Sequence, residues 1–139
     1  MVDPTDLAEG VASVLDAAGV GTYREDGSAY LSDEIAVTLK ELPPNPDQAI
    51  AITVYHEEDS PNSRDPREAK NVQLRFRGTA DDVASVDDVA QAAFVALHGQ
   101  HHTMFGLVPI ARCVRLYIAP LGADENGRHE RTDNYRIVL

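Results

Sequence analysis

The sequence has little cysteine, little lysine and no long apolar run. Its 139 residues contain one cysteine, Cys113, so an intramolecular disulfide is excluded and a reduced place of synthesis fits. Cys113 lies in an apolar run, where a free thiol is far more often an inert core residue than a nucleophile. No window approaches the roughly 20 apolar residues of a membrane-spanning helix, so we expect no membrane association and no targeting segment.

Lysine occurs only at positions 40 and 70, and the formal net charge is −11. Contacts with phosphates need clustered Lys and Arg, so this composition argues against a nucleic-acid-binding surface. The length predicts one domain over residues 1–139, and a compact fold of this size removes roughly two thirds of the unfolded surface from water. Such a core needs neither a disulfide nor a metal for stability.

Two segments have the pattern of amphipathic helices. Asp3 and Pro4 predict an N-cap and a first-turn proline, and apolar residues at helical spacing follow as far as Gly19. The second helix is expected to start within the acidic stretch 79–88, where Ser85 and Asp88 have capping-box spacing, and to end near residues 98–99. Its broad apolar face is typical of a helix that lies across a sheet.

Alternation of apolar and polar residues predicts strands at 35–39, 49–55, 72–77 and 107–119. The longest of these is expected to bulge near Arg112 and to bury one face, made of Val108, Ile110, Val114, Leu116 and Ile118. Residues 23–30 are interpreted as an insertion or a small hairpin. Asn126 and Gly127 predict the turn of a C-terminal hairpin, whose last strand starts near Thr132.

The order of these elements is helix, strands, helix, strands. It predicts an α+β domain with a mixed or antiparallel sheet of about four or five strands and two helices packed on one face.

Residues 56–70 contain almost nothing that can be buried, which predicts a long charged loop. One interpretation is a solvated linker. The other is an arm that contacts a partner, because charged loops with prolines often become ordered only against a neighbour.

The histidines at 98, 101 and 102 form a cluster, but they lie near a glycine in a loop and lack the i, i+4 spacing of a helical metal pair. A helix cap with exposed side chains is the simpler interpretation, and a metal-dependent hydrolase that uses His98, His101 and His102 is the weaker alternative. No Gly-x-Ser-x-Gly motif, phosphate-binding glycine loop or paired-carboxylate pattern occurs. We therefore predict no enzyme activity, no catalytic residues, no metal and no cofactor.

Several short pieces of the chain occur in an order and spacing that resemble a family of phage minor capsid proteins, the tail terminators of lambda-like phages. The pieces lie at residues 19–23, 42–51, 72–78, 96–99 and 122–136, the last of which contains the Asp-Glu-Asn-Gly-Arg run at 124–128. The chain departs from the pattern at Ala123, where a basic residue is expected, and at Arg131, where an apolar or aromatic one is expected. The segment 25–33 is longer than usual.

The resemblance implies a structural virion protein of a long-tailed bacteriophage that carries out no reaction. It would be made in the host cytoplasm and would cap the tail tube as a hexameric ring. Its partners would be other copies of itself, the tail tube protein and the head-tail connector or stopper protein, with DNA passing through the lumen without specific binding. The alternative within the same assembly is a head completion or stopper protein of the neck.

A closed ring needs two different complementary patches on each subunit. The outward arginines on the strand at 72–77 are interpreted as a solvated face when taken alone, but a ring favours an interface role for them. Acidic residues of the loop or the hairpin turn can supply the other patch. A lumen with negative charge is expected. The candidate interface residues are Glu57, Glu58, Asp59, Arg64, Arg67, Arg75, Arg77, Asp124, Glu125 and Arg128.

Overall fold

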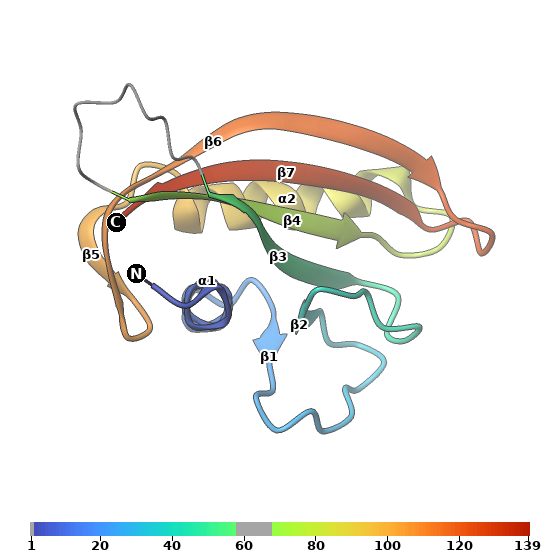
Figure 1. Cartoon of the computed structure of the whole chain (residues 1–139). Helices are drawn as coiled ribbons and strands as arrows, with labels where there is room; N and C mark the ends of the chain where they lie inside the picture. The colour runs from blue at the N-terminus through green and yellow to red at the C-terminus, as the bar shows by residue number, and fades with distance from the viewer. Residues whose placement is uncertain (1, 58–67) are drawn as a thin grey trace.

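The computed structural model describes residues 2–57 and 68–139 (Figure 1). Two helices and seven strands follow one another as α1 (Pro4–Ala17), β1 (Thr22–Tyr23), β2 (Ala36–Leu39), β3 (Ala49–Glu57), β4 (Ala69–Arg77), α2 (Val83–Leu97), β5 (His101–Phe105), β6 (Val108–Ala123) and β7 (His129–Val138).

The two helices begin at aspartate caps. Asp3 caps α1, because its carboxylate accepts the Thr5 N–H at 2.7 Å, as the sequence predicts. In α2 the cap is Asp82, which accepts the Ala84 N–H at 3.1 Å, and the capping-box role expected of Ser85 is wrong. Ser85 lies inside the first turn, and its hydroxyl donates to the Asp82 carbonyl at 2.8 Å.

The strands form one sheet in the order β1-β2-β3-β4-β7-β6-β5. The pairs β1-β2 and β2-β3 are parallel and the others are antiparallel, so the mixed sheet and the two helices are confirmed. The expected number of about four or five strands is wrong, because seven are present. The additional strands are the short β1 and β5. β1 has two residues, which is too few to show alternation, and β5 is mostly exposed, so neither has a buried face that would mark it in the sequence.

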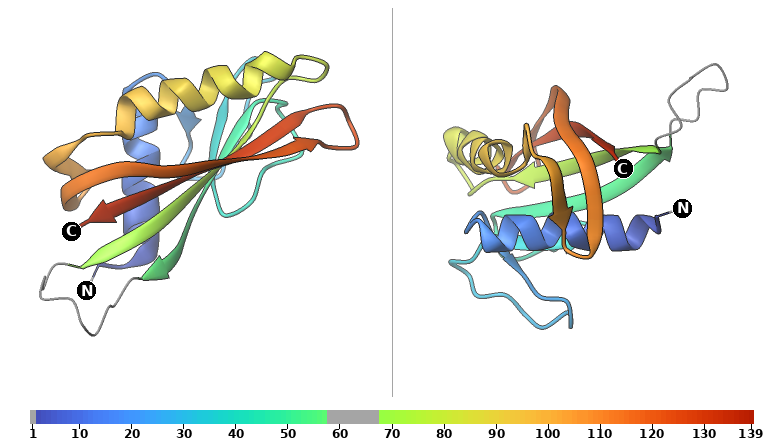
Figure 2. Two further views of the ribbon diagram at one scale, coloured as in Figure 1. Left: turned by 90° about the horizontal axis from the view of Figure 1, so that it is seen from above. Right: turned by 90° about the vertical axis from the view of Figure 1, so that its left-hand side faces the viewer.

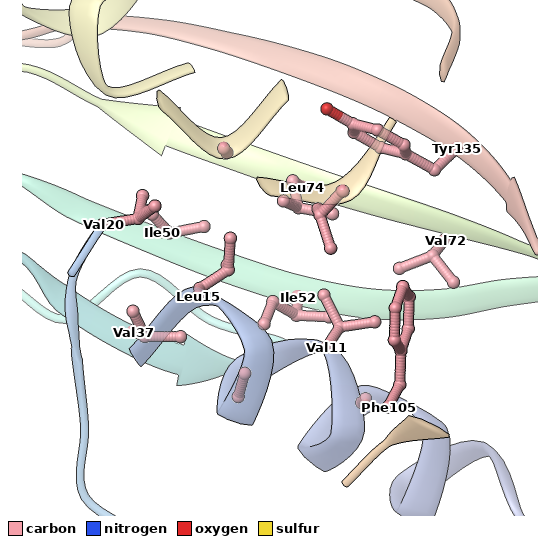
Figure 3. Packing of buried hydrophobic residues seen from close by; sticks show 14 of the residues in the cluster. Val11, Leu15, Val20, Val37, Ile50, Ile52, Val72, Leu74, Phe105 and Tyr135 are labelled. Carbon is pink, nitrogen blue, oxygen red and sulfur yellow. The ribbon is translucent and has the colours of Figure 1, made fainter. Parts of the chain in front are cut away.

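The sheet curls into a half-barrel around α1 (Figures 1 and 2). One cluster of buried apolar side chains joins both helices to the inner face of the strands. Figure 3 shows Val11 and Leu15 of α1 pointing toward Ile52 on β3, with Phe105 of β5 beside Val11. Both helices therefore share one core with the sheet.

β3 lies inside the sheet between β2 and β4. Its residues from Ala49 to Ile52 are almost fully buried on both faces, which confirms the central position that the sequence predicts.

The loop expected at 56–70 does not have the predicted bounds, because strands extend into it from both sides. β3 extends through Glu57 and β4 begins at Ala69, and residues 58–67 lie outside the described part of the chain. Lys70 is buried within β4, where its ammonium lies 3.0 Å from the Glu68 carboxylate. A buried lysine is compatible with a strand when it is paired in this way. A prediction based on the number of apolar residues misses such a position.

The C-terminal hairpin forms around the predicted turn, in which Gly127 has a φ of 75° and donates to the Asp124 carbonyl at 3.1 Å. Its last strand starts three positions earlier than expected, at His129. The bulge expected at Arg112 is also displaced, since the register of β6 against β7 shifts between Arg115 and Tyr117 and again between Pro120 and Gly122.

Candidate protein interface

β6 changes neighbour along its length, because pairing with β7 begins at Arg112, where the pairing with β5 stops. β5 pairs with the residues from Val108 to Arg112, and residues 99 and 100 exchange two further backbone hydrogen bonds with Cys113. The last bond on this side is made by a side chain, because the Arg115 N–H donates to Nδ1 of His98 at 3.0 Å. From Leu116 to Ala123, called the β6 edge below, no strand of the described chain pairs with β6 on the side opposite β7.

The β6 edge is rich in exposed apolar side chains. Leu116, Tyr117, Ile118 and Leu121 are 41–54% exposed. A long apolar strand with one unpaired side is a template for adding another chain, and proteins usually shorten, charge or cover such strands. The β6 edge is long, uncharged and uncovered within the described chain. It is therefore the surface best suited to a protein partner.

A hollow of about 420 Å³ lies between the β6 edge and the start of α2. Ile118 and Pro120 line it from β6, and Val83 lines it from α2, where that side chain is largely exposed. A partner that extended the sheet beyond β6 would cover this hollow as well as the strand edge.

Buried ion pairs hold this part of the hairpin to the rest of the fold. Asp133 of β7 is fully buried, and the guanidinium of Arg131 donates to both of its carboxylate oxygens at 2.9 Å. Arg115 of β6 lies 3.4 Å from the same carboxylate, and Arg131 also reaches Asp87 of α2 at 2.8 Å. Arg131, a position at which the chain departs from the family pattern, thus links the last strand to α2.

Tyr117 of the β6 edge lies near a hydrogen bond between side chains of β3 and β7. Tyr55 donates its hydroxyl to the Asn134 side chain at 3.0 Å, next to Tyr117. Burial, together with a hydrogen bond to Tyr117, raises the pKa of Tyr55 to about 12. Tyr55 is therefore neutral at physiological pH.

Of the predicted interface residues on β4, Arg75 is at the surface and Arg77 is buried. Arg75 is half exposed and pairs with Glu130 at 2.7 Å. Arg77 donates to the carbonyls of Pro43, Pro46 and Asp47 at 2.6–2.8 Å, and burial lowers its pKa. The bonds of Arg77 hold the corner between β2 and β3, so its guanidinium faces its own chain.

The turn residues have mostly internal contacts too. Arg128 is buried and donates to the Pro44 carbonyl at 2.9 Å and to Asp124 at 2.9 Å. Backbone hydrogen bonds, first of all from Arg128, lower the pKa of Asp124. Glu125 is exposed at the tip of the turn. Glu58, Asp59, Arg64, Arg67 and the side chain of Glu57 lie outside the described residues.

Sequence reasoning missed the β6 edge. It expected Leu116 and Ile118 on the buried face, but both are exposed and lie outside the core cluster, at or just beyond a register shift between Arg115 and Tyr117. The signal was the run from 116 to 121, in which apolar residues occupy both alternating sets of positions.

The histidines and the cysteine that the sequence analysis considered have structural surroundings in the described chain. Among residues 2–57 and 68–139, no group of three or more His, Cys, Asp or Glu side chains is placed to hold a metal ion. His98 stacks on Phe94 with ring centroids 4.5 Å apart and accepts the β6 bond described above. Burial raises the pKa of the Cys113 thiol to about 12, so it is protonated at neutral pH. No helix in these residues is both long and apolar enough to cross a membrane.

Comparison with known proteins gives a family and a fold. A family model described as "Bacteriophage tail terminator protein" matches residues 14–139. A chain from the solved structure "Virion of native gene transfer agent (GTA) particle" superposes with a TM-score of 0.58 and 13% identity, covering 73% of this chain and 76% of that one. At this identity the likeness concerns the fold alone. No curated protein matches the sequence.

Proposed function

Since this chain belongs to the bacteriophage tail terminator family, we propose that it caps the tail tube as a hexameric ring and joins the tube to the head-tail connector. The family makes it a structural protein of the phage tail and a component of the virion. The ring, its six subunits and its two binding partners are the parts that we propose.

The observation that carries the proposal is the β6 edge. Its apolar side chains are about half exposed, and the strand has an unpaired side over eight residues, Leu116–Ala123. A subunit that worked alone would be prone to edge-to-edge aggregation, whereas in an assembly the same strand is covered. The exposed edge thus fits a protein that works as one copy among several.

The charge distribution supports a channel for DNA. Asp81 and Asp82, just before α2, and Asp87 and Asp88 in its first half are exposed to solvent, and the chain as a whole has a net charge of −11. A negative lumen repels the phosphate backbone, so DNA would pass through without adhering. The proposal includes no reaction, no metal and no cofactor.

The test is assembly in solution and on tail tubes. We expect light scattering and negative-stain imaging to find six-membered rings, either free or at the ends of purified tubes. Leu116→Arg places a charge on the β6 edge and should abolish the rings, whereas Leu107→Arg is a matched control in the turn between β5 and β6, where the leucine is 93% exposed. A wild-type protein that stays monomeric even with tail tubes would rule the proposal out.

A further inference from the structure

Three residues in mutual contact join the end of α2 to β6. His98, the C-cap of α2, stacks on Phe94 with ring centroids 4.5 Å apart. The guanidinium of Arg115 on β6 lies 4.0 Å from the centre of the same Phe94 ring. The backbone N–H of Arg115 donates to Nδ1 of His98 at 3.0 Å. His98, Phe94 and Arg115 are called the His98 junction below, and Figure 2 shows the chain running from α2 into β5 beside β6.

The hydrogen bond to His98 takes the place of a backbone bond between neighbouring segments. The Gly99 N–H donates to the Cys113 carbonyl at 2.8 Å, and the Cys113 N–H donates to the Gln100 carbonyl at 2.9 Å. Two residues further along β6, an imidazole nitrogen accepts the Arg115 N–H instead of a carbonyl oxygen. The β6 edge starts at the next residue. The imidazole therefore fixes the point at which β6 becomes unpaired on this side.

This hydrogen bond requires a neutral imidazole. A histidine nitrogen accepts a hydrogen bond through its lone pair, and protonation of the ring makes both nitrogens donors. Protonation of His98 would therefore place an Nδ1–H against the Arg115 N–H, and two donors cannot bond to each other. It would also bring a second positive charge to the Phe94 ring, which the Arg115 guanidinium already contacts.

The ionisable groups around the His98 junction do not restore the bond. Asp133 of β7 lies 3.4 Å from the Arg115 guanidinium and so interacts with that side chain. His101 of β5 lies opposite Arg112 in the register of β5 against β6. The C-terminal end of α2 favours a positive charge on His98. It stabilises the charged ring, but it does not return a lone pair to Nδ1.

We propose that the His98 junction is a pH-sensitive switch, in which neutral His98 holds the start of the β6 edge to α2 and protonated His98 releases it. Histidine changes its charge between about pH 8 and about pH 5, so the junction is closed at the upper end of this range and open at the lower end. In the open form the hydrogen bonds on this side of β6 end at Cys113. The inference concerns the single chain and does not depend on the proposed ring.

Hydrogen exchange at single amides of the dilute chain tests the switch. The protection of the Arg115 amide, relative to its intrinsic rate at each pH, should fall about fivefold between about pH 8 and about pH 5, the factor expected for the loss of one ordinary hydrogen bond. The fall should follow the titration of the His98 ring recorded by NMR. The Cys113 amide donates to a carbonyl and is the internal control, which should keep its protection.

Variants of His98 separate its titration from its other contacts. His98→Asn provides a carbonyl oxygen as acceptor and does not titrate, so the Arg115 amide should stay protected at both ends of the pH range. His98→Phe keeps an aromatic ring that can stack on Phe94 but has no acceptor, so this amide should be weakly protected throughout. His101→Ala, on the exposed neighbour, should leave the pH dependence of the wild type unchanged.

Three results would overturn the inference. Constant protection of the Arg115 amide across the pH range would mean that ionisation of His98 does not control the bond. Equal losses of protection at Arg115 and Cys113 would mean that acid loosens β6 as a whole. A pH dependence that persists in His98→Asn would assign the effect to another group.

Discussion

The two halves of β6 belong to one strand but pair with different neighbours. The first residues, from Val108 to Arg112, pair with β5, and Val108 and Ile110 are buried in the core there. The second half, the β6 edge, pairs with β7 alone, and its leucines are about half exposed. Both halves are apolar, and the difference is that Val108, Ile110 and Cys113 belong to the core cluster shared with the two helices, whereas the β6 edge does not. Apolar strand residues thus become core where other elements pack on them and stay exposed where none does.

The largest effect is expected at the ion pairs that hold the β6 edge. Asp133→Ala removes a fully buried carboxylate and leaves Arg131 and Arg115 without it, so we expect urea denaturation to show a loss of about 4 kcal/mol in the free energy of unfolding. Asp88→Ala, an exposed aspartate on α2, is the control and should change little. A loss below about 1 kcal/mol would mean that apolar contacts hold this half of the strand as well.

A direct comparison of the two halves comes from one truncation in each. Ile110→Ala opens a cavity in the core and should reduce the free energy of unfolding by about 3 kcal/mol. Leu116→Ala should change it by less than about 0.5 kcal/mol and should instead weaken assembly, because its side chain is half exposed in the monomer. If urea denaturation of the two monomeric variants showed equal losses in the free energy of unfolding, the two halves of β6 would not differ as described.

A smaller effect marks the boundary between the halves. His98→Ala removes the acceptor of the Arg115 N–H, and we expect a loss of about 1 kcal/mol together with faster hydrogen exchange at the Arg115 amide. His101→Ala, on an exposed neighbour, is the control and should leave that amide unchanged. If hydrogen exchange at the Arg115 amide stays slow in His98→Ala, strand pairing alone protects this amide and the His98 bond does not contribute.

The smallest effect concerns the hairpin tip and depends on pH. The pKa of Asp124 lies below its ordinary value of 3.8, so the ionised carboxylate stabilises the folded turn above that value. This contribution is lost as the pH falls through the lower folded-state pKa. The protection of the Arg128 amide against exchange, relative to its intrinsic rate at each pH, should therefore fall in acid, and Asp124→Asn should remove that dependence.

Local signals predicted the regular elements of the fold well. The Asp3 cap, the alternation in β4 and the turn at Gly127 are each set by neighbouring residues, and each was found where expected. β1 and β5 were missed because pairing with distant strands, rather than their own sequence pattern, makes them strands.

The candidate interface was harder to predict because exposure depends on distant parts of the chain. Arg77 and Arg128 appeared to be available for a partner, but carbonyls at 43–47 accept their hydrogen bonds. Those carbonyls are far from both arginines in the sequence, so no local pattern predicts these bonds. Leu116 appeared to be buried, but it lies outside the core cluster that the helices share with the sheet. The family, in contrast, could be predicted, because its motifs are a matter of sequence alone.

The central position of β7 affects how the protein is made. β7 lies between β4 and β6, and β6 has no other link to the main part of the sheet. During synthesis, residues 101–123 emerge from the ribosome before β7, the strand that attaches them to the sheet. β5 and β6 therefore cannot join the sheet until residues 129–138 have been made. A nascent or truncated chain that lacks β7 cannot present a properly placed β6 edge. In the proposed ring, only a finished subunit could take a position, so incomplete chains would be excluded.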